Sequence, residues 1–141
     1  DSYPNIEWHH FVPQADYNQK FGDMQLDIVV IPRSDDNFNR CKSNLKFLES
    51  SMLEIPVVAQ GFTTGDSPYQ VDPEDAAHME IIVDNSKWLD AIVPLIEDKE
   101  RRQAMGKKAR EYVIAKYDIN KNIIKWAEAY DKLLHGTQSA A

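Results

Sequence analysis

Two short apolar runs constrain the fold of this chain more than any other feature of its sequence. Residues 26–32 and 55–61 are rich in Val and Ile. Runs of this length and composition are typical of strands that are buried on both faces. Between them Leu45, Leu48 and Met52 recur at helical spacing. A strand, a helix and a second strand predict a parallel pair joined by a crossover.

The same pattern continues on both sides of this unit. Residues 6–13 are aromatic and β-branched and predict a strand, and residues 14–23 predict a short helix. Residues 62–78 are rich in Thr, Gly, Ser, Pro and Asp and predict a loop, and residues 79–84 predict one more short strand. We therefore expect an α/β fold with a Rossmann-like parallel sheet of about four strands flanked by helices.

The C-terminal part of the chain is predicted to be helical. A first helix spans residues 86–98, with Pro94 inside it as a kink or a break. Asp98 and Asp118 are placed to cap two further helices. The apolar side of the last helix is formed by Ile119, Ile123, Trp126, Ala127, Tyr130, Leu133 and Leu134.

Composition limits the class of protein. The chain has 141 residues, which suits one domain, and its net charge of −7 argues against a broad nucleic-acid face. The single cysteine, Cys41, forms no internal disulfide, which fits a reducing compartment. No apolar run approaches a membrane span, and the first residues lack the features of a signal peptide. We expect a cytoplasmic protein in which residues 136–141 are a disordered tail.

Ligands of parallel sheets bind beyond the carboxyl ends of the strands. The predicted strand order places loops 12–16, 32–41 and 60–70 on that edge. Within the second loop Asn39 is placed to cap the following helix, which puts Lys42 in its first turn, with Arg33 and Arg40 close in sequence. A lysine there opposes the helix dipole unless an anion binds the free N–H groups.

Lys46 and Glu49 follow on the same predicted helix. A lysine suits a diphosphate, and a carboxylate can accept hydrogen bonds from a ribose diol. The plainer alternative is that Lys42 and Lys46 pair with Glu49 and with the loop carboxylates Asp35 and Asp36 on a solvated surface.

Several motifs in sequence order resemble the C-terminal domain of GT-B-fold group 1 retaining glycosyltransferases, and specifically a bacterial surface-polysaccharide subgroup. The resemblance covers roughly residues 5–134. Its matching positions are the strand 27–32, Asn37, Phe38, Lys46, Glu49, Pro56, Val57, Val58, the helix 88–96 and the helix 101–110.

The resemblance implies that residues 1–135 are a partial nucleotide-sugar-binding domain of an enzyme that transfers a sugar to a glycan or lipid acceptor. Glu49 would bind the ribose, and Lys46 with the backbone of residues 39–43 (Asn39, Lys42 and Ser43 among them) would lie by the diphosphate. Phe11 and Val12 would border the base, and the loop 61–65, which begins at Gly61, would lie near the donor sugar or a phosphate. The donor is a nucleotide-diphosphate sugar, and we expect no metal and no further cofactor. No catalytic residue is assigned.

The sequence departs from the family pattern at several points. Cys41 stands where the family often has a second Glu, and Glu54 stands where it has Gly, so we do not expect a left-handed helix end there. Two opening strands and the N-terminal acceptor domain are lacking, so the fragment by itself is expected to be inactive.

The expected partners are that missing domain, a nucleotide-sugar, an acceptor at a membrane surface, and a second copy bound through the last helix. The alternative is a non-catalytic α/β scaffold or a degenerate transferase half used for partner contacts.

Overall fold

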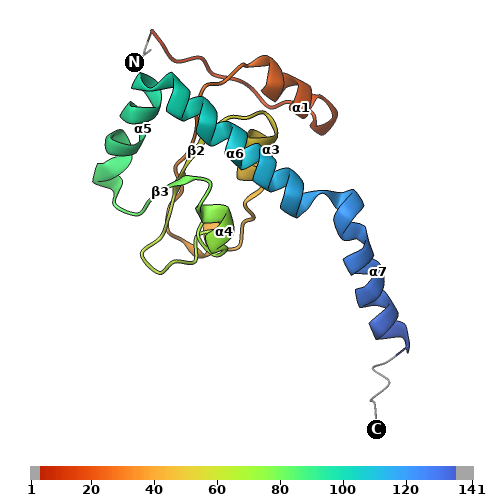
Figure 1. The fold of residues 1–141 in the computed structure, drawn as a ribbon. Coiled ribbons are helices and arrows are strands. Elements are labelled where there is room, and N and C mark those ends of the chain that lie inside the picture. The colour runs from red at the N-terminus through yellow and green to blue at the C-terminus, as the bar shows by residue number, and fades with distance from the viewer. Residues whose placement is uncertain (1–3, 136–141) are drawn as a thin grey trace.

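A computed structural model describes residues 4–135 of the chain (Figure 1). Short strands and helices alternate along the first part of it, and helices make up the rest. In chain order the elements are α1 (Gln14–Asp23), β1 (Val29–Ile31), α2 (Asn37–Arg40), α3 (Leu45–Met52), β2 (Val57–Gln60), α4 (Pro73–Ala76), β3 (Glu80–Ile82), the 3-10 turn η1 (Asn85–Lys87), α5 (Trp88–Glu97), α6 (Lys99–Tyr117) and α7 (Ile119–His135).

The described strands form one small parallel sheet in the order β1-β2-β3. Val30 pairs with Val58 of β2, and Ala59 pairs with Ile81 of β3. Because each connection must cross from one end of the sheet to the other, helices separate the strands in sequence. The prediction of an α/β fold with a parallel sheet and a helical C-terminal part is confirmed.

The central strand β2 divides the core into two parts, because successive side chains of a strand point to opposite faces. Val57 and Ala59 pack on the face covered by α3 and α6, where Phe47 is fully buried. Val58 packs on the other face against Leu95 of α5. Every residue of β2 is buried, as the sequence predicts for a strand covered on both sides.

The predicted strand at residues 6–13 is wrong. This segment has no regular secondary structure, and the side chains of Trp8 and Phe11 are 84% and 92% exposed. Aromatic and β-branched residues favour a strand only where a neighbouring strand completes the hydrogen bonds, and none pairs with this segment. The described part of the chain therefore has three strands rather than about four.

The prediction that residues 26–32 are buried on both faces is correct for one face only. Ile31 is buried, but the side chain of Val30 is 41% exposed. β1 lies at the edge of the sheet, and Val30 is not among the residues packed in either part of the core.

The predicted helix from Asn39 is interrupted. A single turn, α2, ends at Arg40, and α3 begins only at Leu45. Asp36 caps α2 by accepting a hydrogen bond from the backbone N–H of Asn39 at 2.8 Å. Lys42 consequently lies in the link between the helices, and Lys46 is the lysine in the first turn of α3.

The expectation that α3 lacks a left-handed C-terminal cap is wrong. Glu54 has a φ of 60°, in the left-handed region. The N–H of Ile55 donates to the carbonyl of Ser50, and the N–H of Glu54 donates to that of Ser51. These two bonds form a Schellman motif in which a glutamate takes the place usually held by glycine.

Two predicted caps of the C-terminal helices are confirmed. The carboxylate of Asp98 accepts from the N–H of Arg101, and that of Asp118 accepts from the N–H of Asn120. Helix α5 continues through Pro94, which therefore does not break it. The predicted loop at 62–78 contains the short helix α4, which begins at a proline after the capping carboxylate of Asp72.

The last helix, α7, extends away from the rest of the structure (Figure 1). None of its residues is buried. Its exposed large apolar side chains are Ile119, Ile123, Ile124, Trp126, Tyr130, Leu133 and Leu134. No helix within residues 4–135 is long and apolar enough to cross a bilayer. The predicted tail, residues 136–141, lies outside the described residues.

Candidate functional site

Lys46 and Glu49 lie together on the first two turns of α3. The Lys46 Nζ is 2.9 Å from the Glu49 Oε2, and it also donates to the hydroxyl of Tyr17. The Tyr17 hydroxyl in turn donates to the same Glu49 oxygen at 3.3 Å. We call these three residues the Lys46 cluster. Both of the side chains that the sequence singles out for diphosphate and ribose thus share one environment.

The topology explains where this cluster lies. A helix that joins two parallel neighbouring strands runs back along the sheet and begins at its carboxyl edge. Since α3 joins β1 to β2, its amino end is at that edge. Burial lowers the pKa of Lys46, but hydrogen bonds to Tyr17 and Glu49 outweigh burial, and the net shift is upward. The ammonium is therefore fully charged at neutral pH.

Tyr17 connects the cluster to an apolar hollow beside α1. This hollow has a volume of about 450 Å³, and the residues along it include Phe11, Val12, Tyr17 and Phe21. The rings of Tyr17 and Phe21 stack with centroids 5.8 Å apart. Phe11 and Val12, which the resemblance assigns to the base, thus border a hollow lined by aromatic side chains.

A second group of polar side chains follows the end of β1. The Arg33 Nη1 donates to the Asn39 Oδ1 at 3.0 Å, and its Nη2 donates to the Tyr69 hydroxyl at 3.3 Å. The guanidinium also lies over the Tyr69 ring, 5.6 Å from the centroid. These three residues, the Arg33 cluster, join the loops after β1 and β2. The prediction that loops 32–41 and 60–70 meet at one edge is confirmed. Its third part, residues 12–16, is not a loop after a strand, because no strand precedes it in the described part of the chain and α1 begins at Gln14.

The neighbouring cations Arg40 and Lys42 already have interaction partners. Arg40 pairs with Asp35 at 2.5 Å and with Asp66 at 3.4 Å. The Lys42 ammonium lies 3.9 Å above the ring centre of Phe38 in a cation–π contact. Within residues 4–135 no hydrogen bond or ion pair links Asn39 or Lys42 to the Lys46 cluster.

The two remaining predicted positions flank these groups. Ser43 is exposed in the link between α2 and α3. Gly61 directly follows β2, and its N–H donates to the carbonyl of Ile82 at 2.8 Å. A Cβ at Gly61 would lie 2.7 Å from side-chain atoms of both Gln70 and Ile81, so this glycine permits close packing of the loop on β3.

A buried carboxylate that sequence reasoning missed lies near the start of α3. Asp75 of α4 is 2% exposed. It accepts hydrogen bonds from Tyr112 and Tyr117 of α6, each at 2.6 Å, and from the side-chain amide of Asn44. Lys116 completes this Asp75 network at 3.2 Å. Its members are 31 to 42 residues from Asp75 in sequence, so no local motif indicates them.

The Asp75 network fixes the residue before α3. Asn44 is the N-cap residue, yet its side chain accepts no hydrogen bond from the helix, because its amide is turned to Asp75. Burial and the hydrogen bond to Asp75 raise the pKa of Tyr112. Burial lowers the pKa of Lys116, but hydrogen bonds with Asp72, Tyr112, Asp75 and Glu74 more than compensate and raise it overall. The network therefore holds α4, α6 and the start of α3 together.

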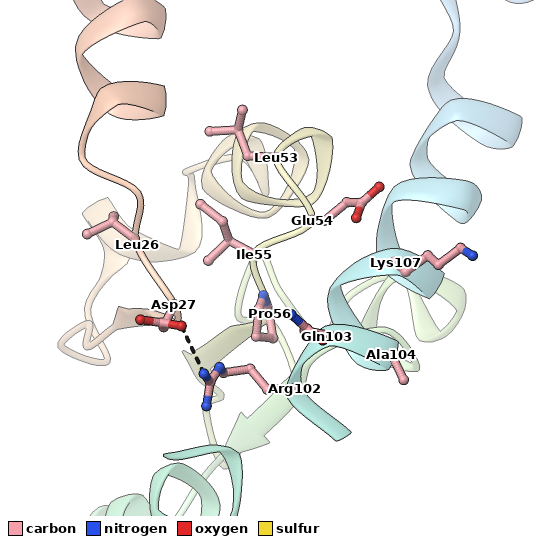
Figure 2. A pocket seen from close by; sticks show the side chains of 10 residues that line it. All are labelled: Leu26, Asp27, Leu53, Glu54, Ile55, Pro56, Arg102, Gln103, Ala104 and Lys107. Atoms are coloured by element: carbon pink, nitrogen blue, oxygen red, sulfur yellow. Dashed lines mark hydrogen bonds and ion pairs between the residues drawn. The ribbon is translucent and has the colours of Figure 1, made fainter. Parts of the chain in front are cut away.

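A further hollow, of about 460 Å³, lies at the opposite edge of the sheet (Figure 2). Asp27 precedes β1 and Pro56 precedes β2, so the hollow is at the amino ends of these strands. Figure 2 shows Arg102 reaching across to Asp27, at 2.9 Å. Arg102 also donates to the carbonyl of Leu95 at the end of α5. The Arg102 guanidinium thus links α6 to the end of α5 and to the segment that leads into β1. Because this cation has a structural role, we place the candidate site at the carboxyl edge instead.

Comparisons with protein families, with curated proteins and with solved structures give no significant match. The geometry of the carboxyl edge and the resemblance of the sequence motifs are therefore the two sources of a functional assignment.

Proposed function

We propose that this chain is the donor-binding part of a glycosyltransferase, a partial GT-B C-terminal domain with a Rossmann-like sheet. It binds a nucleotide-diphosphate sugar, whose glycosyl group passes to a glycan or lipid acceptor held by another part of the enzyme. The setting is cytoplasmic, with the acceptor at a membrane surface.

The observation that carries the proposal is the 2.9 Å contact between Lys46 and Glu49 at the start of α3. A nucleotide diphosphate carries its anionic groups and its ribose diol on neighbouring parts of one molecule. A cation and a carboxylate side by side at the amino end of a helix match that pairing. The side chains of Lys46 and Glu49 are 41% and 20% exposed, so a ligand can reach both.

In the proposed complex each side chain has its own task. Lys46 and the N–H groups at the start of α3 stabilise the negative charge that develops on the leaving diphosphate. Glu49 accepts hydrogen bonds from the ribose through its Oε1, for which the described residues provide no donor. The aromatic hollow beside Tyr17 receives the base.

Titration calorimetry with UDP-, GDP- and dTDP-sugars tests the proposal directly. One of the three is expected to bind, and Glu49→Gln is expected to weaken that binding about ten-fold, because hydrogen bonds to a charged group are among the stronger ones. Free diphosphate lacks the diol, so its affinity is expected to change little in the same variant.

Glu111→Gln is the matched control, because Glu111 is an exposed glutamate on α6 that makes no hydrogen bond or ion pair with the Lys46 cluster within residues 4–135. Absence of binding by all three sugar nucleotides, or an equal loss in the two variants, contradicts the proposal.

A second candidate function is a non-catalytic α/β scaffold, or a degenerate transferase half, that contacts partners. The specific observation in its favour is the apolar side of α7, where Ile123, Trp126 and Tyr130 are 55%, 58% and 60% exposed. Apolar patches of this extent typically mark interaction sites. Nucleotide-sugar binding by the chain distinguishes a transferase half from a generic scaffold.

A further inference from the structure

Arg33 carries a positive charge that no carboxylate neutralises within residues 4–135. Both of its hydrogen bonds go to uncharged acceptors, the amide oxygen of Asn39 and the hydroxyl of Tyr69. Arg40, seven residues on, is by contrast paired with two carboxylates. Two arginines on one edge of the sheet thus differ in whether their charge is balanced.

The hydrogen-bonding capacity of Arg33 is also incompletely used. A guanidinium has N–H groups on Nε, Nη1 and Nη2, and only one bond from each Nη atom has a partner in the described part of the chain. The Nε is buried and has no acceptor among residues 4–135. An unsatisfied N–H of a charged group is costly, so such groups are usually completed by water or a ligand.

The position of Arg33 fits a ligand-binding role. It follows β1 by two residues, at the carboxyl edge where ligands of parallel sheets bind. Its two partners come from different elements, since Asn39 belongs to α2 and Tyr69 to the loop after β2. The Tyr69 ring is fully buried, so the phenol is a rigid support for the guanidinium.

We propose that Arg33 binds an oxyanion of the phosphate class at this edge, using the Nη N–H groups that the described residues leave without acceptors. The identity of the oxyanion rests on the proposed function: it is the diphosphate of the donor. Arg33 is then a diphosphate-binding residue in addition to Lys46. A planar guanidinium suits this task because it makes paired hydrogen bonds to phosphate oxygens.

The charges around Arg33 set the conditions for such binding. Asp35 and Asp66 are occupied by Arg40, and the Asp36 carboxylate is occupied by the backbone and side-chain N–H groups of Asn39. These acidic groups repel an anion at long range, and the nearby cation Lys42 offsets part of that repulsion. Affinity for a small anion is therefore expected to be modest and to fall with salt.

The test is titration of inorganic pyrophosphate into the full chain at low ionic strength, comparing Arg33→Lys with Arg40→Lys. Both variants keep the charge and replace a fork of donors by a single ammonium. Arg33→Lys is expected to weaken pyrophosphate binding about five- to ten-fold, because it removes the paired contact. Arg40→Lys is expected to change the affinity less than about two-fold, because its paired charge does not contact the ligand.

A measurement on the unmodified protein keeps the proposal falsifiable if Arg33→Lys fails to fold. Pyrophosphate is expected to shift the Nε–H NMR signal of Arg33 in the wild-type chain and to leave that of Arg40 in place. No pyrophosphate binding by the wild type, equal effects of the two substitutions, or an unmoved Arg33 signal overturns the assignment.

The outcomes also separate this proposal from the function proposed above. Pyrophosphate bound through Arg33 without any sugar-nucleotide binding supports the anion site and contradicts the transferase assignment. Sugar-nucleotide binding that depends on Glu49 but is the same in Arg33→Lys supports the transferase assignment and overturns the role of Arg33.

Discussion

The backbone carbonyl of Glu54 lies directly against Gly106, so that a Cβ added at Gly106 would sit 1.8 Å from the carbonyl oxygen. This contact joins the left-handed end of α3 to the middle of α6. Because Glu54 leads into β2, the crossing also fixes how α6 lies on the sheet. The left-handed turn at Glu54 and the glycine in α6 are thus two parts of one packing arrangement.

Gly106→Ala is expected to destabilise the protein although alanine is the better helix former. The gain in helix propensity is about 1 kcal/mol. A clash with a backbone atom cannot be relieved by a rotamer change, and overpacking costs about 1–3 kcal/mol. The difference is a net loss of up to about 2 kcal/mol in the free energy of unfolding, measured by urea denaturation.

Gly22→Ala is the matched control, because Gly22 also lies in a helix but has no atom within 4 Å of an added Cβ. It is expected to raise stability by about 0.5–1 kcal/mol. A stabilising effect of Gly106→Ala would contradict the close approach of α3 and α6.

Glu54→Gly is expected to stabilise the protein. A residue with a side chain is disfavoured at a φ of 60°, whereas glycine takes this conformation readily. The ion pair with Arg110, at 3.4 Å, is largely exposed and contributes little. The free energy of unfolding should rise by about 0.5–1 kcal/mol, less than the full strain because glycine also adds entropy to the unfolded chain.

Glu54→Ala separates the effect of losing the carboxylate from the effect of relieving the backbone strain. It removes the carboxylate but keeps a Cβ in the left-handed region, so its stability should stay within about 0.5 kcal/mol of the wild type. Equal stabilisation by alanine and glycine would show that the charge, rather than the backbone conformation, is responsible.

The strands and helices with strong local signals were predictable from sequence. The run at 55–61 is buried as β2, and the caps at Asp98 and Asp118 follow from residue type and position. The segment 6–13 has the same strand signal but no strand beside it, and pairing is decided by tertiary neighbours rather than by propensity. Likewise, a glutamate in the left-handed cap is held by the contact with Gly106, which no local pattern reveals.

The candidate site was predictable only in part for the same reason. Lys46 and Glu49 are three residues apart on one helix, so their proximity follows from helical geometry. Tyr17 of α1 is 32 residues from Glu49 in sequence. Helical periodicity relates only residues within one helix, so it could not predict this contact. Arg33 had a usable signal, because it is a charged residue directly after a predicted strand, but only the structure shows that its charge is unpaired.

Alkaline pH is expected to destabilise the fold through the Asp75 network. The pKa values of Tyr112 and Lys116 are raised above their ordinary values of 10.0 and 10.5. Above those values the unfolded chain loses protons that the folded chain retains, so stability decreases as the pH rises. The contribution is complete below about pH 10, and the melting temperature should fall progressively above it.

Tyr112→Phe should reduce the steepness of this alkaline decline, measured by thermal unfolding between neutral and strongly alkaline pH. It should also lower stability at neutral pH by about 1 kcal/mol, because Asp75 loses a donor. Tyr130→Phe is the matched control, since Tyr130 is 60% exposed on α7. Identical pH profiles for the two variants would contradict a role for the network.

The exposed side of α7 is expected to drive self-association of the chain. Ile119, Ile123, Trp126, Tyr130 and Leu133 follow one another at alternating spacings of four and three, so they form a single stripe along the helix. Lys121 and Glu128 lie on the opposite, polar side. Burying the stripe against a second copy removes apolar surface from water without displacing any contact of the described structure.

Sedimentation velocity over a wide concentration range should show a monomer–dimer equilibrium. The double substitution Ile123→Gln and Trp126→Gln should shift this equilibrium to monomer, whereas Lys121→Gln with Glu128→Gln should leave it unchanged. A wild-type chain that stays monomeric throughout, or a dimer that survives loss of the stripe, would show that α7 does not mediate contact between copies.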